Sequence, residues 1–200
     1  MPKKYIAEAV GTFGLSFVVL GALSFAGVLP VPVPALAALT LGLFVYTIGG
    51  VSGCHINPAV TIGLWSVKKI TQRDALGYVL AQVGGATLAV VIAGWFGIVS
   101  PIEGGVFDAR VFASEALGTF FFVFGIAAVV SGKVHDAMSG LVVGWSLLFG
   151  IMVAVVAGSA GILNPAVAGA LGLFSAVYLL APIAGAVAAF HAHRYIADIS

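Results

Sequence analysis

The segment GCHINPAV at residues 53–60 contains the tripeptide Asn57-Pro58-Ala59, and this tripeptide occurs twice in the chain. The second copy, Asn164-Pro165-Ala166, lies 107 residues further on. The stretches EAVGTF at residues 8–13 and EALGTF at residues 115–120 are separated by the same 107 residues. Two unrelated coincidences would not share one offset, so the sequence predicts an internal duplication.

Each tripeptide has the composition of a helix start. Asn is among the best N-cap residues, because its side-chain oxygen accepts a hydrogen bond from a backbone N–H of the first turn. Pro fits the first helical position, where its missing N–H costs nothing. The Asn oxygen is then occupied, which leaves its NH₂ group free to donate outward. One copy alone could be an ordinary capped helix in a loop, but two copies at the repeat spacing argue against that.

The composition is that of a polytopic membrane protein. Of 200 residues, 62% are hydrophobic and 8% are charged, whereas a soluble domain carries about 25% charged residues. A net charge of +1 argues against nucleic acid as a partner. With one cysteine, neither an internal disulfide nor a cysteine metal site is possible. We expect no metal or other cofactor.

The apolar stretches divide the chain into six long spans and two short helices. The short helices begin at Pro58 and at Pro165. The first ends near Lys69, so it covers about 15 Å, half of a ~30 Å hydrocarbon core. The predicted membrane spans are residues 5–28, 35–50, 74–99, 111–130, 137–158 and 175–195. The predicted fold class is an all-α membrane protein with two half-helices.

Three spans per repeat give the two copies opposite orientations in the membrane. The single domain 1–200 then consists of an inverted repeat, 1–107 and 108–200. Seven basic residues fall on one side of the membrane and only Arg110 falls on the other, which predicts cytoplasmic termini. The seven are Lys3, Lys4, Lys68, Lys69, Arg73, Lys133 and Arg194.

Inversion brings the two half-helices together near the membrane midplane. Non-helical backbone survives at that depth only where it is buried or lines a water-filled path. The loops before each Asn are therefore predicted to present backbone carbonyls along a pore. The predicted carbonyl groups belong to Gly53, Cys54, His55, Ile56, Ala160, Ile162 and Leu163.

This arrangement resembles the major intrinsic protein family, the aquaporins and glycerol facilitators, over nearly the whole chain. The matching segments are Ala7-Glu8 with Gly11-Thr12-Phe13, Ser52–Thr61, Ala81-Gln82 with Gly84-Gly85, Glu115 with Gly118-Thr119-Phe120, Asn164-Pro165-Ala166, and Pro182 with Gly185. The resemblance implies a passive channel in the cell membrane rather than an enzyme. It also implies a homotetramer with one pore per subunit and both Asn-Pro-Ala motifs in that pore.

Several polar residues in the apolar regions have two possible roles. Glu8 and Glu115 could form a proton relay or accept N–H groups of the buried loops, and the matching family residues favour the second, structural role. His55 could gate the pore or hold the loop, and the resemblance favours the loop. Cys54 is predicted to face the cytoplasmic vestibule, with burial behind the loop as the alternative.

The chain departs from the family at the outer constriction. Most members place Arg three residues after the second Asn, where this chain has Val167. Ungapped counting puts the other three constriction residues at Ala37, Met152 and Gly161, and one gap would move the first to Leu36 or Ala38. The set carries no charge, which predicts a wide, apolar outer mouth.

These patterns favour a passive channel for water and small uncharged solutes such as glycerol. Three alternatives remain open. The chain could be a non-conducting membrane scaffold of the same fold, or a channel for ammonia or another small neutral solute. The buried glutamates and the inverted repeat also leave room for a coupled transporter.

Overall fold

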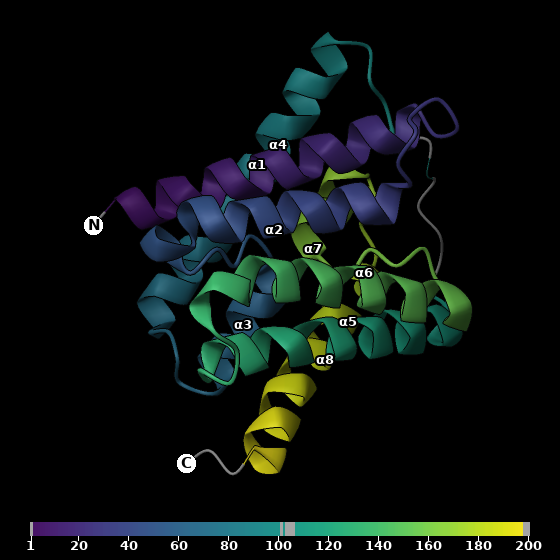
Figure 1. Cartoon of the computed structure of the whole chain (residues 1–200). Coiled ribbons are helices and arrows are strands. Elements are labelled where there is room, and N and C mark those ends of the chain that lie inside the picture. Colours follow the sequence, from purple (N-terminus) through teal and green to yellow (C-terminus); the bar gives the residue numbers. More distant parts are fainter. Residues whose placement is uncertain (1, 101, 103–106, 198–200) are drawn as a thin grey trace.

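The computed structural model describes residues 2–100, 102 and 107–197, and across those residues the chain is helical with no strand (Figure 1). Eight α-helices and one 3-10 helix follow one another in these ranges. They are α1 (Lys3–Ser24), α2 (Val33–Ser52), α3 (Pro58–Ser66), α4 (Gln72–Trp95), α5 (Ala109–Val130), η1 (Asp136–Met138), α6 (Ser139–Ala157), α7 (Pro165–Ala170) and α8 (Ala176–Ile196).

Six helices among the described residues are long and apolar enough to cross a membrane: α1, α2, α4, α5, α6 together with η1, and α8. This confirms the predicted all-α class with six spans and two short helices. The third span ends four residues before its predicted end at Val99. Gly97 takes a φ of 72°, and the N–H of Ile98 donates to the carbonyl of Ala93 at 2.9 Å. This is the Schellman motif, which closes a helix at a left-handed residue.

The long helices of the two halves pack in matching ways. α1 lies against α4, and α5 lies against α8. A methyl group added at Gly85 of α4 would lie 2.2 Å from the carbonyl oxygen of Ala9, and one at Gly185 of α8 would lie 2.2 Å from that of Ala116. Ala9 and Ala116 are themselves 107 residues apart. Glycine therefore permits the same backbone approach in both halves.

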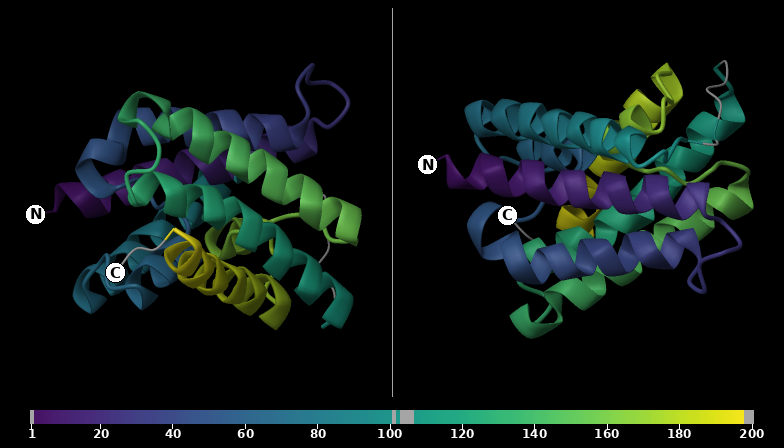
Figure 2. Two further views of the ribbon diagram at one scale, coloured as in Figure 1. Left: turned by 60° about the horizontal axis from the view of Figure 1, so that its bottom comes forward. Right: turned by 90° about the horizontal axis from the view of Figure 1, so that it is seen from above.

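The half-helices tie the two halves together. α3, from the first half, packs on α8, and α7, from the second, packs on α4. α2 and α6 also pack on each other between the halves. The chain ends N and C lie at the same end of the helix bundle in both views of Figure 2. The division of the chain into 1–107 and 108–200 stays a prediction.

Candidate functional site

Both Asn-Pro-Ala segments start a helix through an asparagine cap. The side-chain oxygen of Asn57 accepts the N–H of Ala59 at 2.8 Å. The side-chain oxygen of Asn164 accepts the N–H groups of Ala166 at 3.0 Å and Val167 at 3.4 Å. Pro58 and Pro165 occupy the first helical positions. Both segments therefore have the asparagine cap and the proline at the first helical position that their sequence predicts.

The two asparagine amides bind across the interface between the loops. The Nδ2 of Asn57 donates to the carbonyl of Leu163 at 2.9 Å, and the Nδ2 of Asn164 donates to the carbonyl of Ile56 at 3.0 Å. The expectation of wholly free NH₂ groups needs correction. An NH₂ group has two hydrogens, so one N–H of each amide holds the opposite loop and the second makes no hydrogen bond to the other described residues.

The buried carboxylate of Glu8 holds the first loop in a backbone conformation that residues other than glycine rarely adopt. Cys54 and Ile56 have positive φ angles of 50° and 36°, which costs free energy in a β-branched residue such as isoleucine. Glu8 Oε1 accepts from the backbone N–H of His55 at 2.9 Å and from the Ser52 hydroxyl at 2.7 Å. Glu8 Oε2 accepts from the N–H of Ile56 at 2.6 Å.

Glu115 has the matching contacts in the second half. Its carboxylate accepts the N–H groups of Ile162 at 3.0 Å and Leu163 at 2.8 Å, and it also accepts the hydroxyl of Ser159. One partner differs, because Gln82 Nε2 donates to Glu8 at 2.8 Å, whereas the corresponding place on α8 is a proline. Loop donors face the oxygens of both acids, so we propose a structural role for both.

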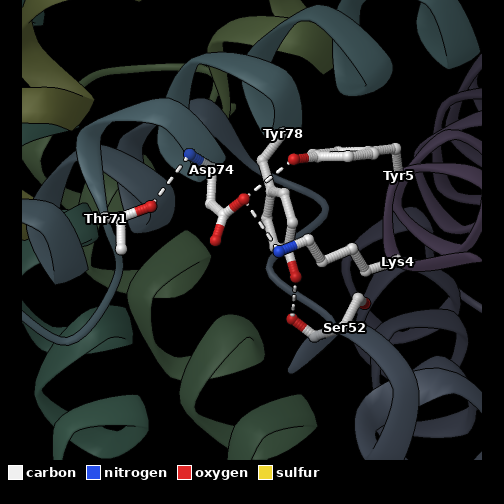
Figure 3. A network of polar contacts seen from close by, with 6 residues as sticks. All are labelled: Lys4, Tyr5, Ser52, Thr71, Asp74 and Tyr78. Carbon is white, nitrogen blue, oxygen red and sulfur yellow. Dashed lines mark hydrogen bonds and ion pairs between the residues drawn. The ribbon is translucent and has the colours of Figure 1, made fainter. Parts of the chain in front are cut away.

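A polar network on α1 and α4 supports the first loop from behind (Figure 3). The Asp74 carboxylate binds Lys4 Nζ and the Tyr5 hydroxyl, each at 2.8 Å. The Tyr78 hydroxyl, one turn further along α4, donates to the Ser52 carbonyl at 2.7 Å. The Tyr78 ring also meets the His55 ring edge-on, with 4.9 Å between centroids. Tyr78 therefore joins α4 to the first loop, and the Asp74 contacts join α4 to α1.

A cavity of about 220 Å³ lies between the two loops and the surrounding helices. Among the described residues, the polar lining side chains are His55, Asn57 and Asn164, and the rest of the described wall is mainly aliphatic. The other lining residues are Leu15, Val19, Leu23, Val33, Pro34, Ala37, Leu41, Ile56, Ile102, Phe122, Leu147, Ile151, Ala160, Gly161, Ile162 and Val167. The cavity is therefore apolar, with a polar point at the two asparagines.

Three of the four predicted constriction residues line this cavity: Ala37, Gly161 and Val167. Met152 does not, because its side chain is 56% exposed on the outside of α6. Its neighbour Ile151 lines the cavity instead and lies 3.0 Å from the position that a Cβ on Gly161 would take. Successive residues of an α-helix point about 100° apart, so an error of one position moved the prediction from the cavity wall to the outer surface.

The loop residues predicted to line the pore divide into two groups. His55, Ile56, Ala160 and Ile162 line the cavity. Gly53, Cys54 and Leu163 are absent from the described lining residues of that cavity. Leu163 is fully buried, and its carbonyl is bound by Asn57.

The sequence predicted that the Cys54 thiol faces the cytoplasmic vestibule, but in the structure the residue is buried. Cys54 is 5% exposed and packs in the hydrophobic core, which matches the alternative of burial behind the loop. We therefore expect a membrane-permeant maleimide to label Cys54 slowly in the folded protein and completely after denaturation in sodium dodecyl sulfate. Mass spectrometry of the intact chain measures both. Complete labelling of the folded protein within the time needed for the denatured one would contradict the buried position.

The sequence did not predict the other side chains that form hydrogen bonds with the two loops or with the glutamates that hold them. Ser52 and Ser159 each lie five residues before an asparagine and share the repeat spacing, a signal that was available. From α4, Gln82 binds Glu8 and Tyr78 binds the Ser52 carbonyl. No local sequence pattern predicts these contacts. Arg110 is the one basic residue predicted on the outer side. It packs near Gly158 and is absent from the described lining of the cavity, so it does not replace the missing arginine.

Comparison with known proteins agrees with this geometry. The model of the major intrinsic protein family matches residues 1–193. Aquaporin AqpM of Methanothermobacter thermautotrophicus is 31% identical over an alignment of 243 positions, which covers 98% of each chain. Glycerol uptake facilitator protein-like 6 of Lactiplantibacillus plantarum is 33% identical over 205 residues, 94% of each chain.

A solved structure shares the fold. The aquaglyceroporin from Plasmodium falciparum superimposes with a TM-score of 0.82 over 98% of this chain and 97% of its own, at 22% sequence identity. Together with six apolar helices, these similarities make the chain a multi-pass membrane protein. The chain therefore belongs to the major intrinsic protein family, and is a channel for water or small solutes and not an enzyme.

Proposed function

We propose that this chain conducts water and small uncharged solutes such as glycerol through a wide outer pore that has no arginine. The observation that carries the proposal is the side chain at Val167. It lines the cavity together with Ala37, Ile151 and Gly161, and we take these four uncharged residues as the collar of the outer pore. Pore diameter and the donors that line the pore set selectivity in such channels. A collar without a cationic donor admits a polyol more readily than a narrow charged one does.

The polar point of the pathway is proposed to lie at Asn57 and Asn164. Each amide keeps one N–H beyond its bond to the opposite loop, and each asparagine lines the cavity. The start of a helix carries a partial positive charge, about half an elementary charge at most. Two such helix starts, at α3 and α7, disfavour a cation that has also lost its hydration shell. With no arginine in the collar, cation exclusion depends on these two ends and on desolvation.

Flux through purified protein in liposomes tests the function. Vesicles that contain the chain are expected to shrink and re-swell under a glycerol gradient several times faster than empty vesicles, with a low activation energy. Stopped-flow light scattering measures water and glycerol in one instrument. Rates equal to those of empty vesicles for every neutral solute, ammonia included, would identify the non-conducting scaffold. Dependence on a proton or sodium gradient would identify a coupled transporter.

The assembly and orientation are also proposals. The exposed faces of the long helices are apolar, which suits both lipid contact and association with further copies as a homotetramer. The basic residues at the end of the bundle that carries both termini support a cytoplasmic location for that end in the cell membrane.

A further inference from the structure

A second cavity lies at the end of the bundle where α3, α5 and α8 finish. Its volume is about 260 Å³, several times the ~30 Å³ that one water molecule occupies in the liquid. Cationic and imidazole side chains gather on its wall: Lys68 and Lys69 after α3, and His193 and Arg194 on α8. Val67, Ala127, Val130, Ser131 and Phe190 complete the wall. Among the residues that the structure describes, no acidic side chain is part of this wall.

Lys68 occupies a backbone position that usually belongs to glycine. Its φ is 61°, and the N–H of Lys69 donates to the carbonyl of Leu64 at 2.9 Å, which is the Schellman closure of α3. A left-handed conformation is costly for a side chain with a Cβ and free of that cost for glycine. The corresponding closure of α7 has Gly172, with a φ of 80°. Local folding therefore does not explain the lysine.

The inverted repeat supplies an internal comparison for the rest of the cavity. At the repeat spacing, Ala127 and Val130 of α5 match Leu20 and Leu23 of α1. The paired glycines Gly85 and Gly185 align α4 with α8, so that His193 and Arg194 match Ala93 and Gly94. The equivalent junction of α1, α4 and α7 thus carries none of these basic groups. The same fold forms there without them, so helix packing does not require the cluster. The positive-inside bias accounts for basic residues at this end of the bundle but not for their place on the wall of one cavity.

From this we infer that the cavity at the ends of α3, α5 and α8 binds a phosphate-bearing anion at Lys68 and Lys69. Ammonium and guanidinium groups donate charge-assisted hydrogen bonds to phosphate oxygens. Basic pockets between membrane helices take lipid headgroups in the same way, and the apolar part of the wall suits the glycerol portion of a phospholipid. A phospholipid headgroup and a soluble phosphate share this chemistry. The site is separate from the cavity at the asparagines.

The test compares two double variants that remove the same charge from the same end of the bundle. Lys68→Gly with Lys69→Gln removes both lysines of the cavity and gives position 68 its favoured residue. Lys3→Gln with Arg73→Gln removes two cations that do not line the cavity. Dioctanoyl phosphatidylglycerol and dioctanoyl phosphatidylcholine are titrated into the detergent-solubilised full chain, and bound lipid is counted by native mass spectrometry. Radiolabelled inorganic phosphate is titrated separately by equilibrium dialysis.

The first variant is expected to keep or raise the melting temperature and to lose roughly 10- to 30-fold in affinity for the anionic probe, since each cation near such a surface contributes about one kcal/mol. The second is expected to stay within about twofold, since its charges lie outside the cavity. Phosphatidylglycerol alone as the bound probe identifies a lipid, and phosphate alone identifies a soluble ligand. An equal loss in both variants, equal binding of phosphatidylcholine, or no binding of either anionic probe would overturn the inference.

Discussion

The Val167→Arg variant is expected to conduct glycerol at least roughly tenfold more slowly than the native channel, while its water flux stays similar or rises. The reason is geometric and electrostatic. Val167 lines the same cavity as Ala37 and Leu41, so a guanidinium there would enter an opening whose described wall is mainly aliphatic. It would narrow the path for a polyol and supply donors that replace the hydrogen bonds water loses on entry. Its charge would also reduce any leak of protons or ammonium.

Stopped-flow measurements on matched proteoliposomes give both solute fluxes for this variant. Val167→Met is the control, because it adds length at the same position without charge or donors. We expect it to slow glycerol less than arginine does and to leave any cation leak unchanged. If the native channel rejects glycerol as firmly as the arginine variant, another residue closes the outer mouth. Ile151, which lines the cavity and lies beside Gly161, is then the first residue to change.

The Glu8→Gln variant is expected to lose about 2–4 kcal/mol of stability, seen as a lower melting temperature and a lower yield of folded protein. The carboxylate oxygens of Glu8 accept from two backbone N–H groups, from Ser52 and from Gln82. An amide would offer one oxygen and turn an NH₂ group toward donors. The loop that Glu8 holds has left-handed residues at Cys54 and Ile56, and it would relax without these bonds.

Glu115→Gln is the internal comparison for this effect. Glu115 accepts from Ser159, Ile162 and Leu163 but has no glutamine donor, so its loss should be the smaller of the two. Asp136→Asn removes one exposed carboxylate at η1 and should change stability by less than ~0.5 kcal/mol. Tryptophan fluorescence during heating measures all three variants. A well-folded Glu8→Gln protein that conducts water normally but has lost proton-linked uptake would show that Glu8 is a relay.

The internal repeat gives both half-helices the same residue after Asn-Pro-Ala. Val60 and Val167 occupy the same position after Asn-Pro-Ala in the two halves, and both are buried at the start of their half-helix. In this chain the two half-helices therefore begin alike. We propose that selectivity then depends on the surrounding wall and on the two asparagines rather than on a charged residue specific to one side.

The sequence alone determined the features that local chemistry encodes. Asn57 and Asn164 cap helices because an asparagine oxygen reaches the N–H groups of its own first turn, and the proline beside each fits only there. The six spans follow from runs of apolar residues long enough for the bilayer. The shared spacing of Glu8 and Glu115 with the asparagines predicted matching surroundings for both acids, and their loop contacts do correspond.

The tertiary structure decided which side chains face one another. Whether Met152 or Ile151 lines the cavity depends on a rotation of about 100° between neighbouring helical residues. A long helix that is apolar on all sides has no polar face from which its rotation could be predicted. The bonds of the asparagine amides to Ile56 and Leu163 join residues more than 100 positions apart. The cavity at Lys68 requires the ends of three helices to meet. Such contacts arise from packing between distant segments, so no local pattern in the chain contains them.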